Sequence, residues 1–124
     1  MKRLIVLLSI FAASWAGASE TARYVATPTD TTVSELVSRW AALDGRDVKW
    51  EAMVDLPIPD ATRLNAKASL SSASNLGDAF GRIAKTAHQA KPDAPVLFGC
   101  AYKTGRVALV VRQVGQPACG APLR

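Results

Sequence analysis

The order of apolar and polar residues in the first half of the chain predicts a helix followed by a strand. Between Asp30 and Gly45 the apolar residues recur at helical spacing and form one stripe. Its members are Val33, Leu36, Val37, Trp40 and Leu43. Thr32 and Glu35 form a capping box, and Gly45 suits a left-handed helix end. Over 47–52, apolar and polar residues then alternate, which is the period of a half-buried strand.

The second half continues with a strand, a helix and a hairpin. Over 64–70, leucine and alanine alternate with polar residues, which favours another strand. A second helix is expected to begin at Ser74 or Asn75, to bury an apolar stripe that includes Phe80, and to end near Gln89.

The clearest strands are the apolar runs 96–102 and 106–112, which three residues ending in glycine connect. Such a loop is typical of a hairpin with a left-handed third position, and it would place Cys100 opposite Ala108. Both faces of the hairpin carry apolar residues. We therefore expect it to be covered on two sides or to lie at the centre of its sheet.

Two short segments complete the expected fold. Residues 24–26 can form a first strand before Pro28. The segment 55–60, DLPIPD, is expected to be an extended edge or a connecting segment, because proline cannot donate to a ladder. The predicted order is β-α-β-β-α-β-β, with the edge segment after the second strand. This is a small α+β domain of two helices packed with short β-sheets.

Residues 1–18 have the pattern of a secretory signal peptide. Lys2 and Arg3 precede an apolar run that ends in an A-x-A-like cleavage site, Ala-Gly-Ala, at 16–18. The run is shorter than a typical membrane span. The alternative is an uncleaved N-terminal anchor. The pattern predicts export, which in a bacterial envelope leads to the periplasm.

Cleavage after residue 18 would leave 106 of the 124 residues, enough for one small domain. We divide this chain into an N-terminal segment 19–29, the α+β domain 30–112 and a C-terminal tail 113–124. The signal peptide takes two positive charges from the net charge of +5, which leaves +3. The remaining basic residues are scattered, whereas nucleic-acid binders concentrate them on one face. No nucleic-acid partner is expected.

Cys100 and Cys119 are the only two cysteines, and both would remain after cleavage. An even count in a small exported domain favours a disulfide, here between the hairpin and the tail. Closing a loop of about 20 residues would stabilise the fold by roughly 3 kcal/mol. The alternative is two free thiols or a redox pair, although no C-x-x-C motif is present.

No catalytic or metal-binding pattern emerges, so no enzyme, metal or cofactor is expected. His88 is the only histidine and is predicted to be exposed at a helix end. The serines gather around a strand-to-helix turn without a G-x-S-x-G motif; they are Ser69, Ser71, Ser72 and Ser74. The aspartates could pair in space, which sequence alone does not show; they are Asp44, Asp47, Asp55, Asp60 and Asp78. Trp40 and Trp50 could form a sugar or peptide platform, but their positions on apolar faces favour core packing.

One set of residues resembles a known family. The pattern V-x-x-L-x-x-W-A-x-x-x-G-x-x-V-x-W comprises Val33, Leu36, Trp40, Ala41, Gly45, Val48 and Trp50. It is followed by Asp55, Leu56, Pro57 and Ile58. This run is similar to the C-terminal domain of the toxin co-regulated pilus biosynthesis protein Q family, which includes pilus-assembly proteins of the PilL type. The resemblance covers about residues 30–112.

The resemblance implies a fold like the short N-terminal domain of secretins and TonB-dependent receptors. It also implies a periplasmic component of a type IV pilus, conjugation or secretion system, which binds an outer-membrane secretin or core complex. Strand addition at an exposed sheet edge would be the physical basis of such binding, with the 55–60 side protected. The alternative is a small exported inhibitor or immunity-type protein that blocks an envelope hydrolase with the tail 113–124.

Overall fold

A computed structural model describes residues 23–123, so the predicted signal peptide 1–18 lies outside the described residues. The elements are, in chain order, α2 (Val33–Ala42), β1 (Asp47–Trp50), α3 (Ala61–Lys67), the 3-10 turn η1 (Leu70–Ser72), α4 (Leu76–Ala90), β2 (Leu97–Ala101) and β3 (Val107–Gln113). The predicted α+β class is confirmed. The predicted order is wrong, because the described chain runs α-β-α-α-β-β, with three α-helices and one three-stranded sheet.

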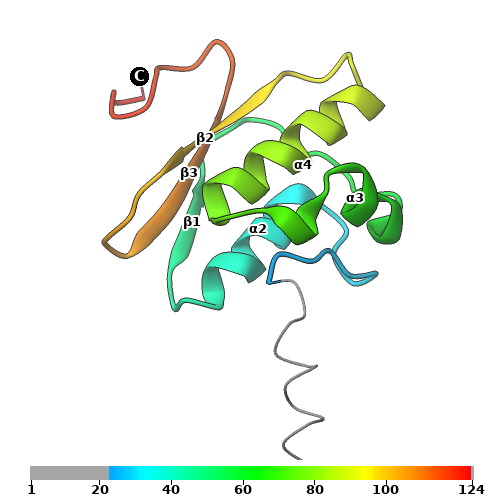
Figure 1. Ribbon diagram of the computed structural model, residues 1–124. Helices are drawn as coiled ribbons and strands as arrows, with labels where there is room; N and C mark the ends of the chain where they lie inside the picture. The colour runs from blue at the N-terminus through cyan, green and yellow to red at the C-terminus, as the bar shows by residue number, and fades with distance from the viewer. Residues whose placement is uncertain (1–22, 124) are drawn as a thin grey trace, which may run out of the picture.

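The sheet has the order β1-β3-β2, with β1 parallel and β2 antiparallel to the central β3. The helices lie on one side of the sheet and the C-terminal tail lies on the other (Figure 1). Both faces of β3 are therefore covered, which explains why apolar residues occupy both faces of the hairpin sequence. The hairpin prediction allowed for this arrangement.

Helix α2 begins as its capping residues predict. The Thr32 hydroxyl accepts a hydrogen bond from the Glu35 backbone N–H at 3.3 Å. The Glu35 carboxylate turns instead to Thr31, accepting from its hydroxyl at 2.6 Å and from its N–H at 3.1 Å. These bonds lower the pKa of Glu35, and the bond from the Thr31 hydroxyl has the largest effect. Beyond the helix, Gly45 has a φ of +68°, the left-handed stop expected there.

Residues 64–70 do not form the predicted strand; they lie in α3 and η1. The Asp60 side chain caps α3 by accepting from the Arg63 N–H at 3.1 Å. The buried residues Ala61, Leu64 and Ala68 are three and four positions apart, so the helical period places them on one face. Alanine has the highest helix propensity and a low strand propensity. The segment therefore forms a helix, although its apolar and polar residues alternate as in a strand.

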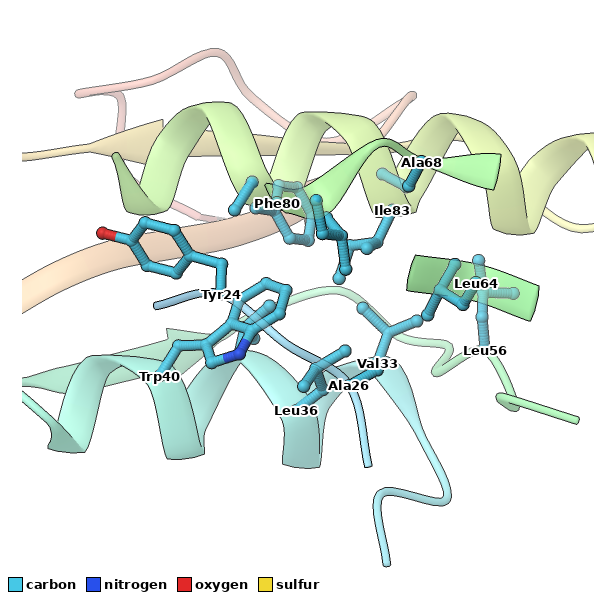
Figure 2. Packing of buried hydrophobic residues seen from close by; sticks show 14 of the residues in the cluster. Tyr24, Ala26, Val33, Leu36, Trp40, Leu56, Leu64, Ala68, Phe80 and Ile83 are labelled. Carbon is cyan, nitrogen blue, oxygen red and sulfur yellow. The ribbon is translucent and has the colours of Figure 1, made fainter. Parts of the chain in front are cut away.

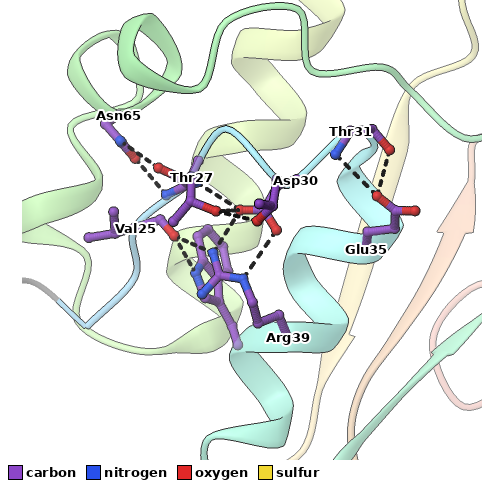
Figure 3. Close-up of polar contacts among 10 residues, drawn as sticks. Val25, Thr27, Asp30, Thr31, Glu35, Arg39 and Asn65 are labelled. Carbon is purple, nitrogen blue, oxygen red and sulfur yellow. Dashed lines mark hydrogen bonds and ion pairs between the residues drawn. The ribbon is translucent and has the colours of Figure 1, made fainter.

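Residues 24–26 are not a strand either, because side chains rather than a neighbouring strand hold this segment (Figure 3). The Asn65 amide accepts from the Ala26 N–H at 2.7 Å and donates to the Ala26 carbonyl at 2.9 Å. The Val25 carbonyl accepts from Arg39 at 2.6 Å and from the Trp40 indole at 3.2 Å. The backbone groups of the segment are thus satisfied without a sheet.

Asp30 is a buried carboxylate beside this segment, with an exposed fraction of 6%. Arg39 donates to both of its oxygens, at 3.1 and 2.7 Å, and the Thr27 N–H donates at 2.7 Å (Figure 3). Burial alone would raise the pKa of Asp30, but the hydrogen bonds from Arg39 and Thr27 outweigh it, and the pKa is lowered. This cluster fixes the start of the described chain onto α2.

The hairpin forms, but its predicted register is wrong by two residues. Cys100 pairs with Val110 rather than with Ala108, and the loop is correspondingly longer. The Arg46 side chain holds the loop by donating to the carbonyls of Gly105 at 2.8 Å and of Tyr102 at 2.9 Å. Because side chains alternate with a period of two, a two-residue shift keeps every residue on its predicted face.

The core lies between the helices and the sheet (Figure 2). Its largest fully buried side chains are Trp40, Phe80, Leu36, Leu70, Ile83, Leu109, Val33, Val37 and Val111. They come from both predicted helices, from the central strand and from η1. The helical stripes and the inward face of β3 therefore share one interior, as the sequence pattern indicates. Leu43 is the exception: it lies at the C-cap of α2 and is 54% exposed, so its predicted place in the buried stripe is wrong.

The tail crosses the outer face of the sheet. A disulfide joins Cys119 to Cys100, with Cα atoms 5.6 Å apart, as predicted. The Arg112 guanidinium, buried on this face, donates to the carbonyls of Pro117 at 3.0 Å and Ala118 at 2.9 Å. It also pairs with Glu51 at 2.8 Å, and this hydrogen bond lowers the pKa of Glu51.

Candidate functional site

The two predicted core tryptophans are buried to different degrees. Trp40 is 1% exposed, and its ring meets Tyr24 edge-on with centroids 5.4 Å apart, so core packing is confirmed. Trp50 is half-buried against the core, and its indole N–H donates to the Val54 carbonyl at 3.0 Å. Both indole N–H groups thus bond to backbone within the domain.

The segment 55–60 is not an edge of the sheet. It runs beside the start of α2, where the Ile58 N–H donates to the Thr31 carbonyl at 2.8 Å. Asp55 accepts from the Ser34 backbone N–H at 3.1 Å and from the Ser34 hydroxyl. The segment therefore caps a helix, and a carboxylate at a helix N-terminus is favourable. The expectation that it shields one sheet edge is wrong.

The other predicted aspartates are separated and bond to nearby groups. Asp44 pairs with Arg23 and Asp47 with Arg106, while Asp60 caps α3. Asp78 accepts from the Ser74 N–H at 3.0 Å and from Arg82 at 3.2 Å. Both bonds lower the pKa of Asp78, and the bond from Ser74 has the larger effect. Within residues 23–123 no three His, Cys, Asp or Glu side chains gather as a metal site would require.

The remaining polar candidates lie around α4. Among the serines, Ser72 bonds back to the Ser69 carbonyl at 3.0 Å, a turn role as expected. His88 is half-buried, so the prediction of an exposed side chain is wrong. Its Nδ1 atom is buried and has no hydrogen-bond partner among the described residues. His88 is not fully exposed because it lies on the side of α4 that faces β2, where it lines a groove.

This groove runs between α4 and the free edge of β2 and has a volume of about 540 Å³. It is lined on the helix side by Gly77, Phe80, Gly81, Ala84, Lys85, His88 and Gln89, and on the strand side by Val96, Leu97, Phe98 and Gly99. A helix and a strand edge thus form its two walls, with the Phe80 ring between them. We take this groove as the candidate functional site.

The strand wall of the groove carries backbone groups that are free to pair. The Tyr102 N–H donates to the Ala108 carbonyl at 2.9 Å, and the Val114 N–H donates to the Val96 carbonyl at 2.8 Å. In an antiparallel pair, hydrogen-bonded residues alternate, so the even-numbered residues of β2 bond to β3. The N–H and C=O groups of Gly99 therefore point away from β3, toward the free edge of the sheet. No further strand of the described chain lies there.

Glycines set the width of the groove. A Cβ atom on Gly99 would lie 2.8 Å from the Phe80 ring, and one on Gly77 would lie 3.0 Å from the Ala101 Cβ, so helix and strand are close at this end. A Cβ on Gly81, one helical turn further on, would meet nothing within 4 Å. The groove therefore opens along α4 from Gly77 toward His88.

The rim of the groove is cationic. Lys85 is exposed on α4 and forms no ion pair with any described residue. His88 and Gln89 follow it at the open end. A segment entering the groove would therefore meet apolar surface at Phe80, backbone donors and acceptors along β2, and a positive charge at the rim. This is the combination that strand addition uses, in which backbone bonds give affinity and side-chain pockets give specificity.

Comparison of the chain with protein families, with curated proteins and with solved structures finds no match. Among residues 23–123, no helix has the length and apolar character needed to cross a membrane. The resemblance to the pilus biosynthesis family consequently remains a prediction, carried by the residues named for it.

Sequence reasoning did not find the groove. Gly77 and Gly81 weaken a helix against alanine, but they also allow a neighbouring element to pack closely. Their spacing of four places them on one face of the helix, and this was the available signal. What faces them depends on how α4 lies against β2, which a period cannot reveal. The prediction of an exposed His88 was wrong for the same reason.

Proposed function

We propose that the protein is a non-catalytic periplasmic assembly component of a type IV pilus, conjugation or secretion system, and that it binds an extended segment of another envelope protein at the edge of β2. A secretin or an outer-membrane core complex is the partner that the family resemblance suggests. The observation that carries the proposal is the unpaired β2 edge, within the described chain, beside a groove that reaches the Phe80 ring.

The disulfide supports the location. Structural disulfides persist in oxidising compartments such as the periplasm, and Cys100–Cys119 fixes the tail to the sheet. The signal-peptide pattern in residues 1–18 predicts the same compartment. Strand addition then suits the domain, because a short exposed edge is protected from indiscriminate pairing by the adjacent wall of α4.

Site-specific photocrosslinking in the producing cell tests the proposal. The crosslinking amino acid replaces Lys85 at the groove rim or, as a control, Lys103 in the hairpin loop. We expect the probe at Lys85 to capture a component of a pilus or secretion machine, identified by mass spectrometry, and the probe at Lys103 not to. Capture of peptidoglycan hydrolases alone would support the inhibitor alternative instead.

A matched pair of variants separates binding from folding. Gly81→Leu places a large side chain in the open groove, whereas Gly81→Ala adds one methyl group. Both should raise helix stability, by up to about 1 kcal/mol for alanine. Only the leucine variant should abolish the Lys85 crosslink. An undiminished crosslink in Gly81→Leu would contradict binding in the groove.

A further inference from the structure

A second hollow lies on another side of α4, away from β2. It is a cavity of about 160 Å³ beside α3 and the proline-containing segment. Its interior is apolar and is formed by Val33, Leu64, Ile83 and Ala87, which come from three different helices. Figure 2 shows Val33, Leu64 and Ile83 gathered at this end of the core.

The size of this cavity suits one side chain. An apolar cavity of about 150 Å³ accommodates a benzene ring, so the present one has room for a phenylalanine or leucine side chain. Pro57 and Pro59 form part of its wall. Proline limits backbone freedom, and this part of the wall is therefore restrained before anything binds.

The rim of the cavity carries a charge that the described chain does not neutralise. Arg63 and Lys67 stand four apart on α3, line the cavity and are exposed. Neither forms an ion pair with a described residue. The Asp60 carboxylate also lines the cavity, where it caps α3, so the rim keeps a net charge of one positive unit. An apolar hollow beside two free cations is complementary to an apolar side chain flanked by carboxylates.

We propose that this cavity is an anchor site for an acidic segment of a partner protein, which inserts one phenylalanine or leucine side chain and pairs its neighbouring carboxylates with Arg63 and Lys67. The anchor site is separate from the β2 groove and does not depend on strand addition there. It gives the domain a second contact surface, as a component that connects two envelope proteins would require.

Three short peptides test the anchor site by NMR titration of the isotope-labelled disulfide-bonded domain. The probe acetyl-Phe-Asp-Asp-amide should shift the signals of Leu64, Ile83 and Ala87. Acetyl-Ala-Asp-Asp-amide should bind about tenfold more weakly, because it lacks the apolar anchor. Acetyl-Phe-Lys-Lys-amide should bind about threefold more weakly or worse, because it meets like charge.

Three variants of the domain complete the test. Ala87→Leu fills the cavity and should abolish the shifts, while Gly81→Leu in the β2 groove should leave them unchanged. If Ala87→Leu disturbs folding, the exposed pair Arg63→Glu and Lys67→Glu provides an independent answer, because it should reverse the preference between the acidic and basic peptides. The inference is overturned if the acidic phenylalanine and alanine peptides bind equally, if charge reversal has no effect, or if the shifts map to β2.

Discussion

The two faces of the sheet are held by different kinds of interaction. On the helix side, Leu109 and Val111 are 0% exposed and pack into a core to which every described helix contributes. On the other side, Cys100 and Arg112 are buried beneath a tail without regular secondary structure. The helix side depends on many apolar contacts, whereas the tail side depends on one covalent bond, the two ion pairs that Glu51 forms, and a few hydrogen bonds.

This difference indicates that the faces respond to different perturbations. Apolar packing is distributed over many side chains and does not depend on redox state or moderate pH. A disulfide and a buried ion pair can each be removed by one chemical change, reduction or protonation. We therefore expect the tail to detach under conditions that leave the helices on the sheet.

Removing the disulfide should have the largest effect. The double variant Cys100→Ala and Cys119→Ala is expected to lose about 3 kcal/mol of unfolding free energy, because the unfolded chain is no longer constrained by the loop. Denaturant unfolding of the variant and of the oxidised parent measures this loss. Amide exchange in 114–123 should accelerate most, while exchange in α4 should still follow global unfolding.

If the tail stayed in place in the reduced protein, the disulfide would not be what holds the tail side of the sheet. Residues 114–123 would then have to be held by hydrogen bonds alone, which include those of Arg112 and Gln116 and the bond from the Val114 N–H to the Val96 carbonyl. Reducing the parent with dithiothreitol provides the control, since it changes no side chain other than the cysteines.

Two adjacent valines of β3 compare the faces directly. Val111 points into the helix-side core and Val110 points toward the tail, where it is only half-buried. Val111→Ala should cost about 2 kcal/mol, because it removes buried methyl groups and leaves a cavity. Val110→Ala should cost distinctly less, about 1 kcal/mol. Equal losses in thermal or denaturant unfolding would show that the tail side is packed as tightly as the core.

The elements that the sequence predicted correctly are those with local signals. In α4, the Asn75 side chain accepts from the Asp78 N–H at 2.8 Å, which decides between the two predicted helix starts, Ser74 and Asn75. In α2, the apolar stripe and Gly45 define a helix within the predicted range. Each signal lies within a few residues, and tertiary contacts do not oppose it.

The errors arose where a local pattern suited two structures. Leu64, Ala66, Ala68 and Leu70 alternate with polar residues, yet Ala61, Leu64 and Ala68 also follow the helical period. Alanine provides little hydrophobic contrast, and the Asp60 cap decided the outcome. The register of the hairpin was predicted wrongly for another reason: the loop is held by Arg46, which is distant from it in sequence.

Acid should weaken the contacts that Glu51 makes on the tail side of the sheet. Because Arg112 lowers the pKa of Glu51 in the folded protein, this carboxylate stabilises the fold above its unfolded value of 4.5, and the contribution is lost as pH falls through the folded pKa. Glu51→Gln should therefore reduce stability near neutral pH, and the difference from the parent should shrink as the solution becomes more acidic. Urea unfolding at a series of pH values measures this difference.

The Asp30 carboxylate provides the matched comparison on the helix side. Its pKa is also lowered, so Asp30→Asn should give the same direction of pH dependence in global stability. The two sites should differ in location: amide exchange near Gln116 should respond to Glu51→Gln and not to Asp30→Asn. A pH-independent effect of Glu51→Gln would contradict the role of the ion pair.

The smallest effect should come from Gln116, whose amide fixes the start of the tail. Its Nε2 group donates to the Glu51 carbonyl at 2.9 Å, and its Oε1 atom accepts from the Gln113 N–H at 2.8 Å. Gln116→Ala should cost about 1 kcal/mol, since it removes bonds that water can partly replace. Exposed Gln89 on α4 is the control, and Gln89→Ala should change the midpoint of unfolding very little. If Gln116→Ala released the tail as fully as loss of the disulfide does, the covalent bond would not be the dominant restraint on that face, and the contrast between the two faces would rest on the polar contacts instead.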